Sequence, residues 1–240
     1  MYTVIGSLRT RAFRVVWMLE ELGQDYEVEP ARPRSETARA YNPSGKVPIL
    51  LVDGEPILDS VAIVQFLADR HRRFTAPAET IERARQDSWT QFSVDDLESP
   101  LWFNAKNTFV LPEELRSQAA QTACKYDFDR ALDHFAQRLG TNEYVTGAEF
   151  CVPDLLIGHC LNWAENGAGW PILMDRYRPT SIAFAPAPLF KGSLPCVTNP
   201  DRPAQAPLHS VLSVLLPSLI PPGGPKPYFF TIVIKRSLNT

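Results

Sequence analysis

Hydrophobic and polar positions alternate between strand-like and helix-like spacing along the first 71 residues. Short apolar or alternating runs at residues 2–5 and 26–30 predict β-strands. Between them, residues 12–22 carry apolar side chains at helical spacing and stop at Gly23, a residue typical of helix C-caps. Residues 35–42 predict a short polar helix.

A proline begins the next apolar run. Residues 48–58 contain two apolar segments joined by Asp-Gly, a pattern that predicts a β-hairpin. Because Pro48 has no N–H to donate to the sheet, we expect it at the start of the strand. A cis Val47–Pro48 bond before it would turn the backbone of Val47 away from the sheet. Residues 60–71 then predict a helix with Ser60 as its N-cap. The order β-α-β-α-β-β-α predicts a small α/β unit with a mixed sheet.

The strand signals stop after a linker at residues 72–79. Residues 80–106 and 112–139 predict two long helices, and the proline and acids at 112–114 are typical of a first helical turn. Residues 152–165 are apolar on most sides and predict a buried central helix.

The composition changes after Tyr177. Residues 178–240 hold twelve of the 22 prolines and a single acid, Asp201, against six Lys or Arg. Proline at this density prevents helices of useful length. We therefore expect an α/β domain over residues 1–75, an all-α domain over 76–177, and an irregular tail over 178–240 that is disordered or a non-native, frame-shifted ending.

Charge and cysteine content exclude several functional classes. A net charge of −3 over 240 residues gives no general attraction to nucleic acid or to an anionic membrane. The N-terminus has no secretory signal pattern, and no run of about 18 apolar residues predicts a membrane-spanning helix. The cysteines form no CxxC motif and no metal-type cluster with the histidines, which favours reduced thiols in a cytoplasmic protein without a metal site. They are Cys124, Cys151, Cys160 and Cys196.

Three stretches together resemble the glutathione transferases: GSLRTRAFRVVWMLEELG at residues 6–23, NPSGKVPIL at 42–50 and LDSVAIVQFLADR at 58–70. The resemblance covers residues 1–177. It implies an α/β thioredoxin-like domain followed by an all-α helical bundle domain. It also implies glutathione as co-substrate without a metal, a small hydrophobic electrophile, a homodimer and a cytoplasmic location.

The same resemblance implies a glutathione-binding set. Val47, before the cis Pro48, would pair through its backbone with the cysteinyl part of glutathione. Asp59 and Ser60 would receive the γ-glutamyl end, since a helix N-terminus suits a carboxylate and an aspartate suits an ammonium. Lys46 would lie beside the glycyl carboxylate. The alternatives are a trans Pro48, an Asp59-Ser60 pair that only caps its helix, and a solvated Lys46.

The sequence offers several candidates for the residue that activates the glutathione thiol. Family members place a hydroxyl or thiol near the start of the first helix, where the helix N-terminus also favours a thiolate. Thr10 lies where serine-type members carry their hydroxyl, although its extra methyl group restricts the side chain. Ser7 is the second candidate, and Arg11 or a backbone N–H is the third. Both hydroxyls could also serve only as caps.

The predicted third helix of the all-α domain supports the resemblance. Asp154 suits a capping box and Phe150 with Leu155 suits a hydrophobic staple, whereas Cys151 is a weak acceptor at the cap itself. Family members would place the electrophile near Trp102 and Phe103.

We therefore expect a glutathione transferase that conjugates the glutathione thiolate to a small electrophile. The alternatives are a glutathione-dependent isomerase, dehalogenase or peroxidase on the same fold, and a non-catalytic binding protein that keeps the fold.

Overall fold

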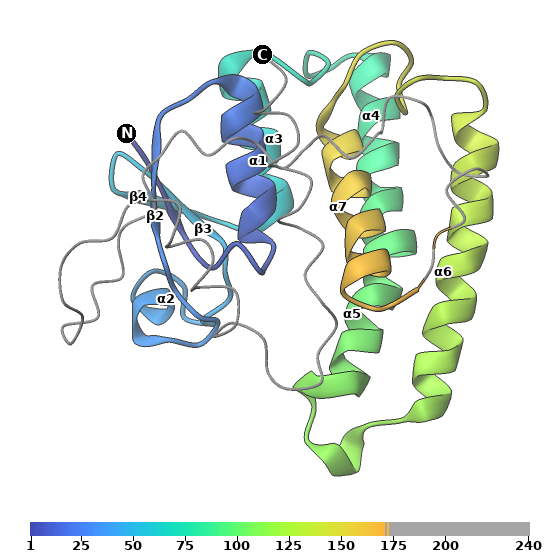
Figure 1. Cartoon of the computed structure of the whole chain (residues 1–240). Coiled ribbons are helices and arrows are strands. Elements are labelled where there is room, and N and C mark those ends of the chain that lie inside the picture. The colour runs from blue at the N-terminus through green and yellow to red at the C-terminus, as the bar shows by residue number, and fades with distance from the viewer. Residues whose placement is uncertain (171, 173–240) are drawn as a thin grey trace, which may run out of the picture. The chain divides into compact units, whose positions relative to one another are not determined.

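Four short strands form one mixed sheet in the order β2-β1-β3-β4 (Figure 1). The computed structural model describes residues 1–170 and 172 of the chain. β1 (Tyr2–Ile5) runs parallel to β2 (Tyr26–Glu29) and antiparallel to β3 (Ile49–Val52), and β3 is antiparallel to β4 (Glu55–Leu58). The proline-led hairpin predicted from the sequence is thus present as β3 and β4.

Three helices accompany the sheet. α1 (Ala12–Leu22) ends at Gly23, which adopts the left-handed conformation with φ 69°, as predicted. α3 (Ser60–His71) packs beside α1, and α2 (Glu36–Tyr41) lies away from both of them in Figure 1. This βαβαββα arrangement confirms the predicted thioredoxin-like domain.

The alternating side chains of the strands divide between two cores. Val4 and Leu50 pair across β1 and β3 and are fully buried among the residues of α1 and α3. The next pair, Ile5 and Ile49, is equally buried but packs with Ala31 in a separate small cluster. Both faces of the central strands are therefore covered, which fits their nearly continuous apolar sequence.

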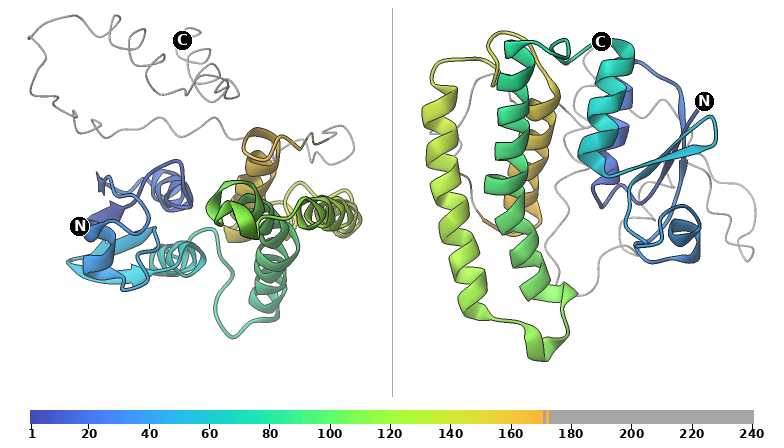
Figure 2. Two further views of the ribbon diagram at one scale, coloured as in Figure 1. Left: turned by 90° about the horizontal axis from the view of Figure 1, so that it is seen from below. Right: turned by 180° about the vertical axis from the view of Figure 1, so that it is seen from behind.

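The second half of the described chain is helical. Its helices are α4 (Ile81–Phe92), α5 (Ser99–Ala105), α6 (Gln118–Leu139) and α7 (Val152–Asn166). α7 contacts α1 and α3 as well as α4, so it belongs to the cores of both domains (Figure 2). The predicted buried central helix, and the predicted helical domain after the thioredoxin-like one, are confirmed.

The long helix predicted over residues 80–106 is not continuous. A π-helical turn, Ser93–Glu98, separates α4 from α5, and a second one follows at Lys106–Val110. Pro100 lies in the first turn of α5 and has no N–H to bond the carbonyl four residues earlier, so a uniform α-helix through this point would lose a hydrogen bond. The apolar spacing alone did not reveal this interruption.

The helix predicted to begin at residue 112 begins later. Glu113–Leu115 forms a separate 3₁₀ turn, and α6 begins after Ser117, whose hydroxyl accepts the Ala120 N–H at 3.2 Å. A serine cap satisfies a helix N-terminus better than the proline-acid segment can, because that segment offers no equivalent acceptor at the right position. The prediction that residues 112–114 form the first turn of this helix is therefore wrong.

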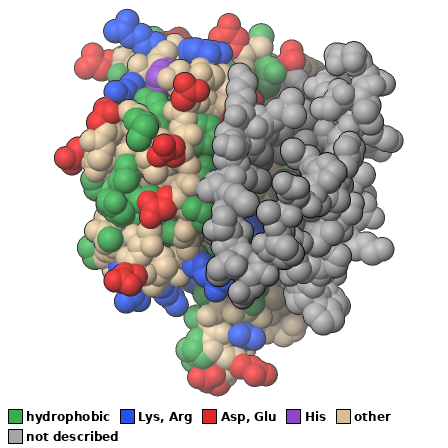
Figure 3. Space-filling view, turned by 60° about the vertical axis from the view of Figure 1, so that its left-hand side comes forward, with side chains coloured by type: hydrophobic (Ala, Val, Ile, Leu, Met, Phe, Trp, Pro, Cys, Tyr) green, Lys and Arg blue, Asp and Glu red, His purple; other side chains and the backbone are tan. Residues whose placement is uncertain are grey.

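Residues 178–240, for which the sequence predicts an irregular tail, lie outside the described residues. Within the described part, none of the helices is both long and apolar enough to cross a membrane. On the face drawn in Figure 3, acidic and basic side chains are interspersed with hydrophobic ones.

Candidate functional site

Three loops meet at one end of the sheet. Ile49, at the start of β3, pairs with Ile5 at the end of β1 and with Leu58 at the end of β4. The residues that follow β1, precede β3 and follow β4 consequently lie at the same edge. These loops contain most of the residues that the sequence singles out: Ser7, Thr10, Lys46, Val47, Pro48, Asp59 and Ser60.

Gly6 brings the first loop close to the second. Its φ is +151°, and a Cβ added there would lie 2.9 Å from the Cβ of Ala12 and 3.4 Å from that of Val47. Only glycine allows so close an approach without displacing backbone-attached atoms. The position of Ser7 beside the Val47 segment therefore depends on this glycine.

The Val47–Pro48 peptide bond is cis, which confirms the prediction. Within residues 1–170 and 172, no hydrogen-bond partner is present for the backbone N–H or C=O of Val47. The loop before it is fixed by Asn42, whose side-chain amide donates to the Lys46 carbonyl at 3.0 Å. The Lys46 side chain itself is exposed.

Asp59, rather than Ser60, is the N-cap of α3. One carboxylate oxygen of Asp59 accepts the N–H groups of Val61 at 2.9 Å and Ala62 at 3.4 Å. The prediction of Ser60 as N-cap is wrong because Asp59 adopts a φ of 72°, which turns its side chain over the helix start. Ser60 instead lies inside the first turn, only 3% exposed, and its hydroxyl accepts a hydrogen bond from Arg14 Nη1 at 3.3 Å.

The two candidate hydroxyls of the first loop have different partners. Thr10 Oγ1 donates to the Ser7 carbonyl at 2.6 Å and accepts the Ala12 N–H at 3.2 Å, so both its proton and one lone pair are used at the start of α1. Ser7 Oγ accepts the Arg9 N–H at 3.3 Å. Among the described residues, no acceptor is present for the Ser7 hydroxyl proton.

Thr10→Ala is expected to lower the free energy of unfolding by about 0.5–2 kcal/mol, the scale of a lost helix cap, because it removes the hydroxyl that bonds the Ser7 carbonyl and the Ala12 N–H before α1. Urea unfolding followed by circular dichroism measures this. Thr10→Ser keeps the hydroxyl and should restore most of the loss. A Thr10→Ala protein as stable as the wild type would show that the two hydrogen bonds contribute nothing.

Arg11, directly before α1, and Arg14, in its first turn, both contact the helical domain. Both guanidinium groups pair with the Glu98 carboxylate in the π-helical turn before α5, Arg14 Nη2 at 2.7 Å from Oε2 and Arg11 Nε with Oε1. The Arg11 guanidinium also lies 5.2 Å from the ring centre of Trp102 and 5.3 Å from that of Trp163. Arg11 is therefore held by the helical domain beside the candidate site.

Neither Arg14 nor Glu98 was singled out by the sequence analysis. The available signal was an arginine among the apolar residues of FRVVWML, which the helical spacing places on a buried face. Lys, Arg and Glu are almost never fully buried unless paired, so a buried arginine implies an acidic partner elsewhere in the chain.

Stability should depend on pH through Glu98. Burial alone would raise the pKa of this carboxyl, but the charges of Arg14 and Arg11 outweigh burial and hold its pKa below the usual range. Because the folded pKa is the lower one, the stabilisation is complete above the ordinary Glu pKa of about 4.3 and is lost as pH falls through the folded value. Urea unfolding between pH 7 and pH 3 should show a smaller loss on acidification in Glu98→Gln than in the wild type. Parallel pH curves for the two proteins would contradict this.

A capping box begins α7. The Asp154 carboxylate, 1% exposed, accepts the backbone N–H groups of Cys151 and Val145, both at 2.9 Å. Burial raises the pKa of Asp154, and these hydrogen bonds partly offset that shift. Cys151 also donates its thiol to Asp154 Oδ2 at 3.0 Å, and burial followed by the Asp154 charge raises the pKa of that thiol. Phe150 and Leu155, the predicted staple, both belong to the N-terminal core or pack against it.

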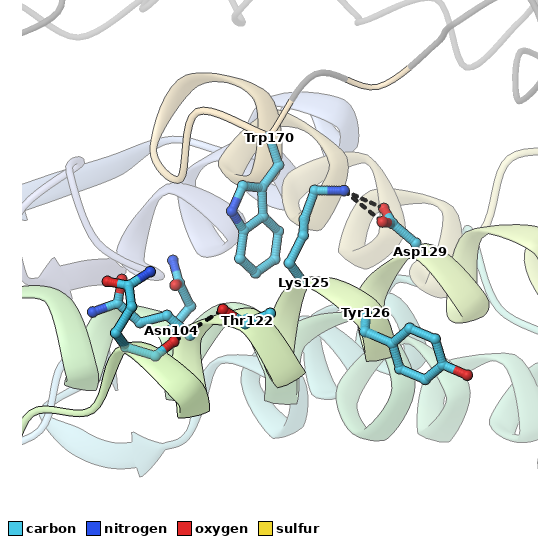
Figure 4. A pocket seen from close by; sticks show the side chains of 8 residues that line it. Asn104, Thr122, Lys125, Tyr126, Asp129 and Trp170 are labelled. Carbon is cyan, nitrogen blue, oxygen red and sulfur yellow. Dashed lines mark hydrogen bonds and ion pairs between the residues drawn. The ribbon is translucent and has the colours of Figure 1, made fainter.

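Trp102 and Phe103 lie in different surroundings. Trp102 contacts Arg11 near the candidate site, whereas Phe103 lines a hollow that also includes Cys124 and His134 of α6. A further hollow of about 430 Å³, drawn in Figure 4, lies between α5, α6 and Trp170 and is lined by Lys125, paired with Asp129. Neither hollow is lined by a residue of the three converging loops.

Comparisons with family models, curated proteins and solved structures all find glutathione transferases. The model of the glutathione S-transferase N-terminal domain matches residues 10–70. The chain is 28% identical over 162 residues to glutathione S-transferase 3 of Schizosaccharomyces pombe, an alignment that covers 60% of this chain and 66% of that protein. A glutathione S-transferase structure from Pseudomonas fluorescens Pf-5 superposes with a TM-score of 0.63 at 25% identity, covering 75% of this chain and 91% of that one. These matches show that the chain is similar to glutathione transferases, in its first domain by sequence and over the described residues by fold.

A fungal relative shares the fold at lower identity. The structure of glutathione transferase URE2P8 from Phanerochaete chrysosporium with oxidised glutathione superposes on this chain with a TM-score of 0.67 at 19% identity. It covers 76% of this chain and 86% of that one. Among the described residues, no group of three or more His, Cys, Asp or Glu side chains is arranged to hold a metal ion.

Proposed function

We propose that this protein is a glutathione transferase that binds glutathione at the three converging loops and conjugates its thiolate to a small hydrophobic electrophile. The observation that carries the proposal is the meeting of Ser7, Val47 and Ser60 at one end of the sheet, which follows from the pairing of Ile49 with Ile5 and Leu58. Relatives named as glutathione transferases, one of them with oxidised glutathione bound, support the same conclusion.

Each part of the tripeptide has a chemically suitable partner. The free N–H and C=O of Val47 suit the cysteinyl backbone, since an extended peptide can pair with both groups. Ser60 offers a hydroxyl at the N-terminus of α3, where a carboxylate is favoured, and Asp59 keeps a carboxylate oxygen for the ammonium. The exposed ammonium of Lys46 suits the glycyl carboxylate.

The chemical step needs a thiolate. We propose that the Ser7 hydroxyl donates a hydrogen bond to the glutathione sulfur and stabilises it as an anion. The Thr10 hydroxyl is less suited to this role because it already donates to the Ser7 carbonyl. The nearby N-terminus of α1 adds a favourable dipole. The thiol proton leaves to solvent, the sulfur attacks the electrophilic carbon, and the new C–S bond replaces the bond to the leaving group. The electron pair of that bond departs with the leaving group.

One observation favours a second candidate, a non-catalytic glutathione-binding protein. The hydroxyl at the position of the serine-type members, that of Thr10, is bonded within the loop before α1, and Ser7 stands three residues earlier. An assay with aryl halides, epoxides and peroxides separates the candidates. Turnover of an aryl halide or epoxide supports the transferase, and turnover of peroxides alone supports a peroxidase. Binding without turnover of any of them supports the second candidate.

Ser60→Ala is expected to weaken glutathione binding by about 1–3 kcal/mol, because it removes a hydroxyl that donates to a charged carboxylate. Titration calorimetry of the wild type and the variant measures this. Ser88→Ala, which removes a hydroxyl that accepts a hydrogen bond from Arg138 in the helical domain, serves as a control and should bind normally. Equal affinity of Ser60→Ala and wild type would show that Ser60 does not contact the ligand.

The family also implies a homodimer and a cytoplasmic location, which we include in the proposal. Analytical ultracentrifugation of the purified chain should give twice the monomer mass of 26.9 kDa.

A further inference from the structure

Arg11 lies in the first of the three converging loops, and its guanidinium contacts two tryptophan rings of the helical domain. The guanidinium carbon is 5.2 Å from the ring centre of Trp102 in α5 and 5.3 Å from that of Trp163 in α7. Both distances are within the range of cation–π contacts. Since 29% of the Arg11 side chain is exposed, these contacts hold a positive charge in place at a point that solvent can reach.

The two tryptophans belong to a larger group of aromatic side chains from α1, α5 and α7. His159 lies one turn before Trp163 in α7, and their ring centres are 6.3 Å apart. Phe13, in the first turn of α1, lies 6.3 Å from the His159 ring. Trp102 is 36% exposed, and the other three side chains are half-buried. Partly exposed rings in one group leave surface against which a flat aromatic ligand can pack.

The positive charge of Arg11 is only partly balanced. Its Nε pairs with Glu98 Oε1, but Glu98 Oε2 lies 2.7 Å from Nη2 of Arg14, so one carboxylate serves two guanidinium groups. His159 adds no charge, because burial of its Nδ1, and then the charges of Arg14 and Arg11, hold its pKa well below the ordinary value. One positive charge therefore remains. Arg11 presents it to solvent, because the Arg14 side chain is 0% exposed.

The end of the Arg11 guanidinium is available to a ligand. Within residues 1–170 and 172, its Nε donates to Glu98, and no acceptor is present for Nη1 or Nη2. These two groups form the end of a planar fork whose geometry matches both oxygens of a carboxylate. Because Glu98 and the tryptophans already hold the side chain, less conformational entropy is lost when it binds a ligand.

We propose that Arg11 makes this protein selective for aromatic electrophiles that carry a carboxylate. Arg11 binds the carboxylate, and the neighbouring aromatic side chains pack against the ring of the electrophile. The proposal rests on the proposed function, since Ser7 of the same loop is the residue proposed to stabilise the thiolate. With an aryl chloride, the thiolate sulfur forms a bond to the ring carbon that carries chlorine, and chloride leaves with the electron pair of the C–Cl bond. The thiol proton goes to solvent.

The test uses two aryl chlorides of nearly equal shape, 4-chloro-3,5-dinitrobenzoate and the neutral 4-chloro-3,5-dinitrobenzamide. We measure kcat/KM for each at saturating glutathione, in the wild type and in Arg11→Gln. The ratio of benzoate to benzamide should fall about tenfold in the variant, the scale of one lost hydrogen-bonded contact between charged groups. Comparing ratios cancels the different intrinsic reactivities of the two compounds and any general effect of the substitution on the site. An unchanged ratio would overturn the proposal.

Arg9→Gln is the matched control. It removes an exposed charge of the same sign two residues earlier in the same loop. Its benzoate-to-benzamide ratio should stay within about twofold of the wild type, because a hydrogen-bonded contact acts at short range whereas exposed charges are screened by salt. A fall as large as that in Arg11→Gln would show that the net charge of the loop attracts the benzoate, and would overturn the proposal.

The wild type alone provides a measurement that needs no variant and holds even if Arg11→Gln does not fold. The unreactive compounds 3,5-dinitrobenzoate and 3,5-dinitrobenzamide lack the leaving chloride and should inhibit competitively with the electrophile. The benzoate should inhibit at a concentration about tenfold lower than the benzamide. Equal inhibition by the two compounds would overturn the proposal.

Failure of the proposed function would look different. A wild type that does not bind glutathione overturns both proposals. A wild type that binds glutathione and conjugates other electrophiles, but shows no preference for the benzoate or conjugates neither aryl chloride, overturns only the role of Arg11.

Discussion

Replacing Ser7 by alanine is expected to reduce kcat for glutathione conjugation about 10²-fold, the scale on which loss of one preorganised donor to an anion acts. Ser7 has the hydroxyl proton that no described residue accepts, and Gly6 places it beside the Val47 segment. Steady-state kinetics at saturating glutathione with an aryl halide measure the change. KM for glutathione should change little, because the proposed contacts that hold the tripeptide are made mainly by Val47, Asp59 and Ser60.

Thr10→Ala provides the comparison for this experiment. The Thr10 hydroxyl bonds the Ser7 carbonyl and the Ala12 N–H at the start of α1, so the variant should lose stability but retain kcat. If Thr10→Ala loses the activity and Ser7→Ala keeps it, the assignment of the two hydroxyls is reversed. If both keep it, the thiolate is stabilised by the backbone N–H groups at the start of α1 or by Arg11.

Replacing Asp154 by alanine is expected to lower the free energy of unfolding by about 2–6 kcal/mol, because two buried backbone N–H groups would each lose their acceptor at about 1–3 kcal/mol. The groups are those of Val145 and Cys151, and both residues are less than 10% exposed. Urea unfolding should show a lower midpoint with an unchanged m-value.

Asp154→Asn is the matched control, since it keeps one oxygen acceptor and should lose clearly less stability than Asp154→Ala. Cys151→Ser tests the unusual cap residue, because a hydroxyl can replace the thiol as donor to the Asp154 carboxylate. A loss below about 1 kcal/mol in Asp154→Ala would mean that water or other groups replace both hydrogen bonds.

The sequence predicts the elements of the thioredoxin-like domain because the signals there are local. Gly23 ends α1, Asp-Gly joins β3 to β4, and Pro48 begins the strand segment, each through its own backbone preference. The helical domain is predicted less well. Its interruptions at Ser93–Glu98 and Lys106–Val110 leave the apolar spacing almost unchanged, so a periodic pattern does not reveal them.

In the candidate site, too, some features could be predicted from local sequence and others could not. The positions of Val47 and Ser60 follow from motifs that lie next to each other along the chain. The roles of Asp59 and Thr10 depend on dihedral angles and hydrogen bonds that neighbouring residues decide, and the sequence could not rank them. The Arg14–Glu98 pair joins residues 84 positions apart, and no local pattern brings them together.

The central claim is that the three converging loops bind glutathione and stabilise its thiolate, and the most direct test is the pKa of the bound thiol. The thiolate absorbance of the glutathione complex, titrated with pH, should give a pKa at least one unit below the value of about 8.5 for a free cysteine thiol. The Ser7→Ala complex should titrate closer to the free value. A wild-type complex that titrates like free glutathione, or no complex at all, would contradict the claim.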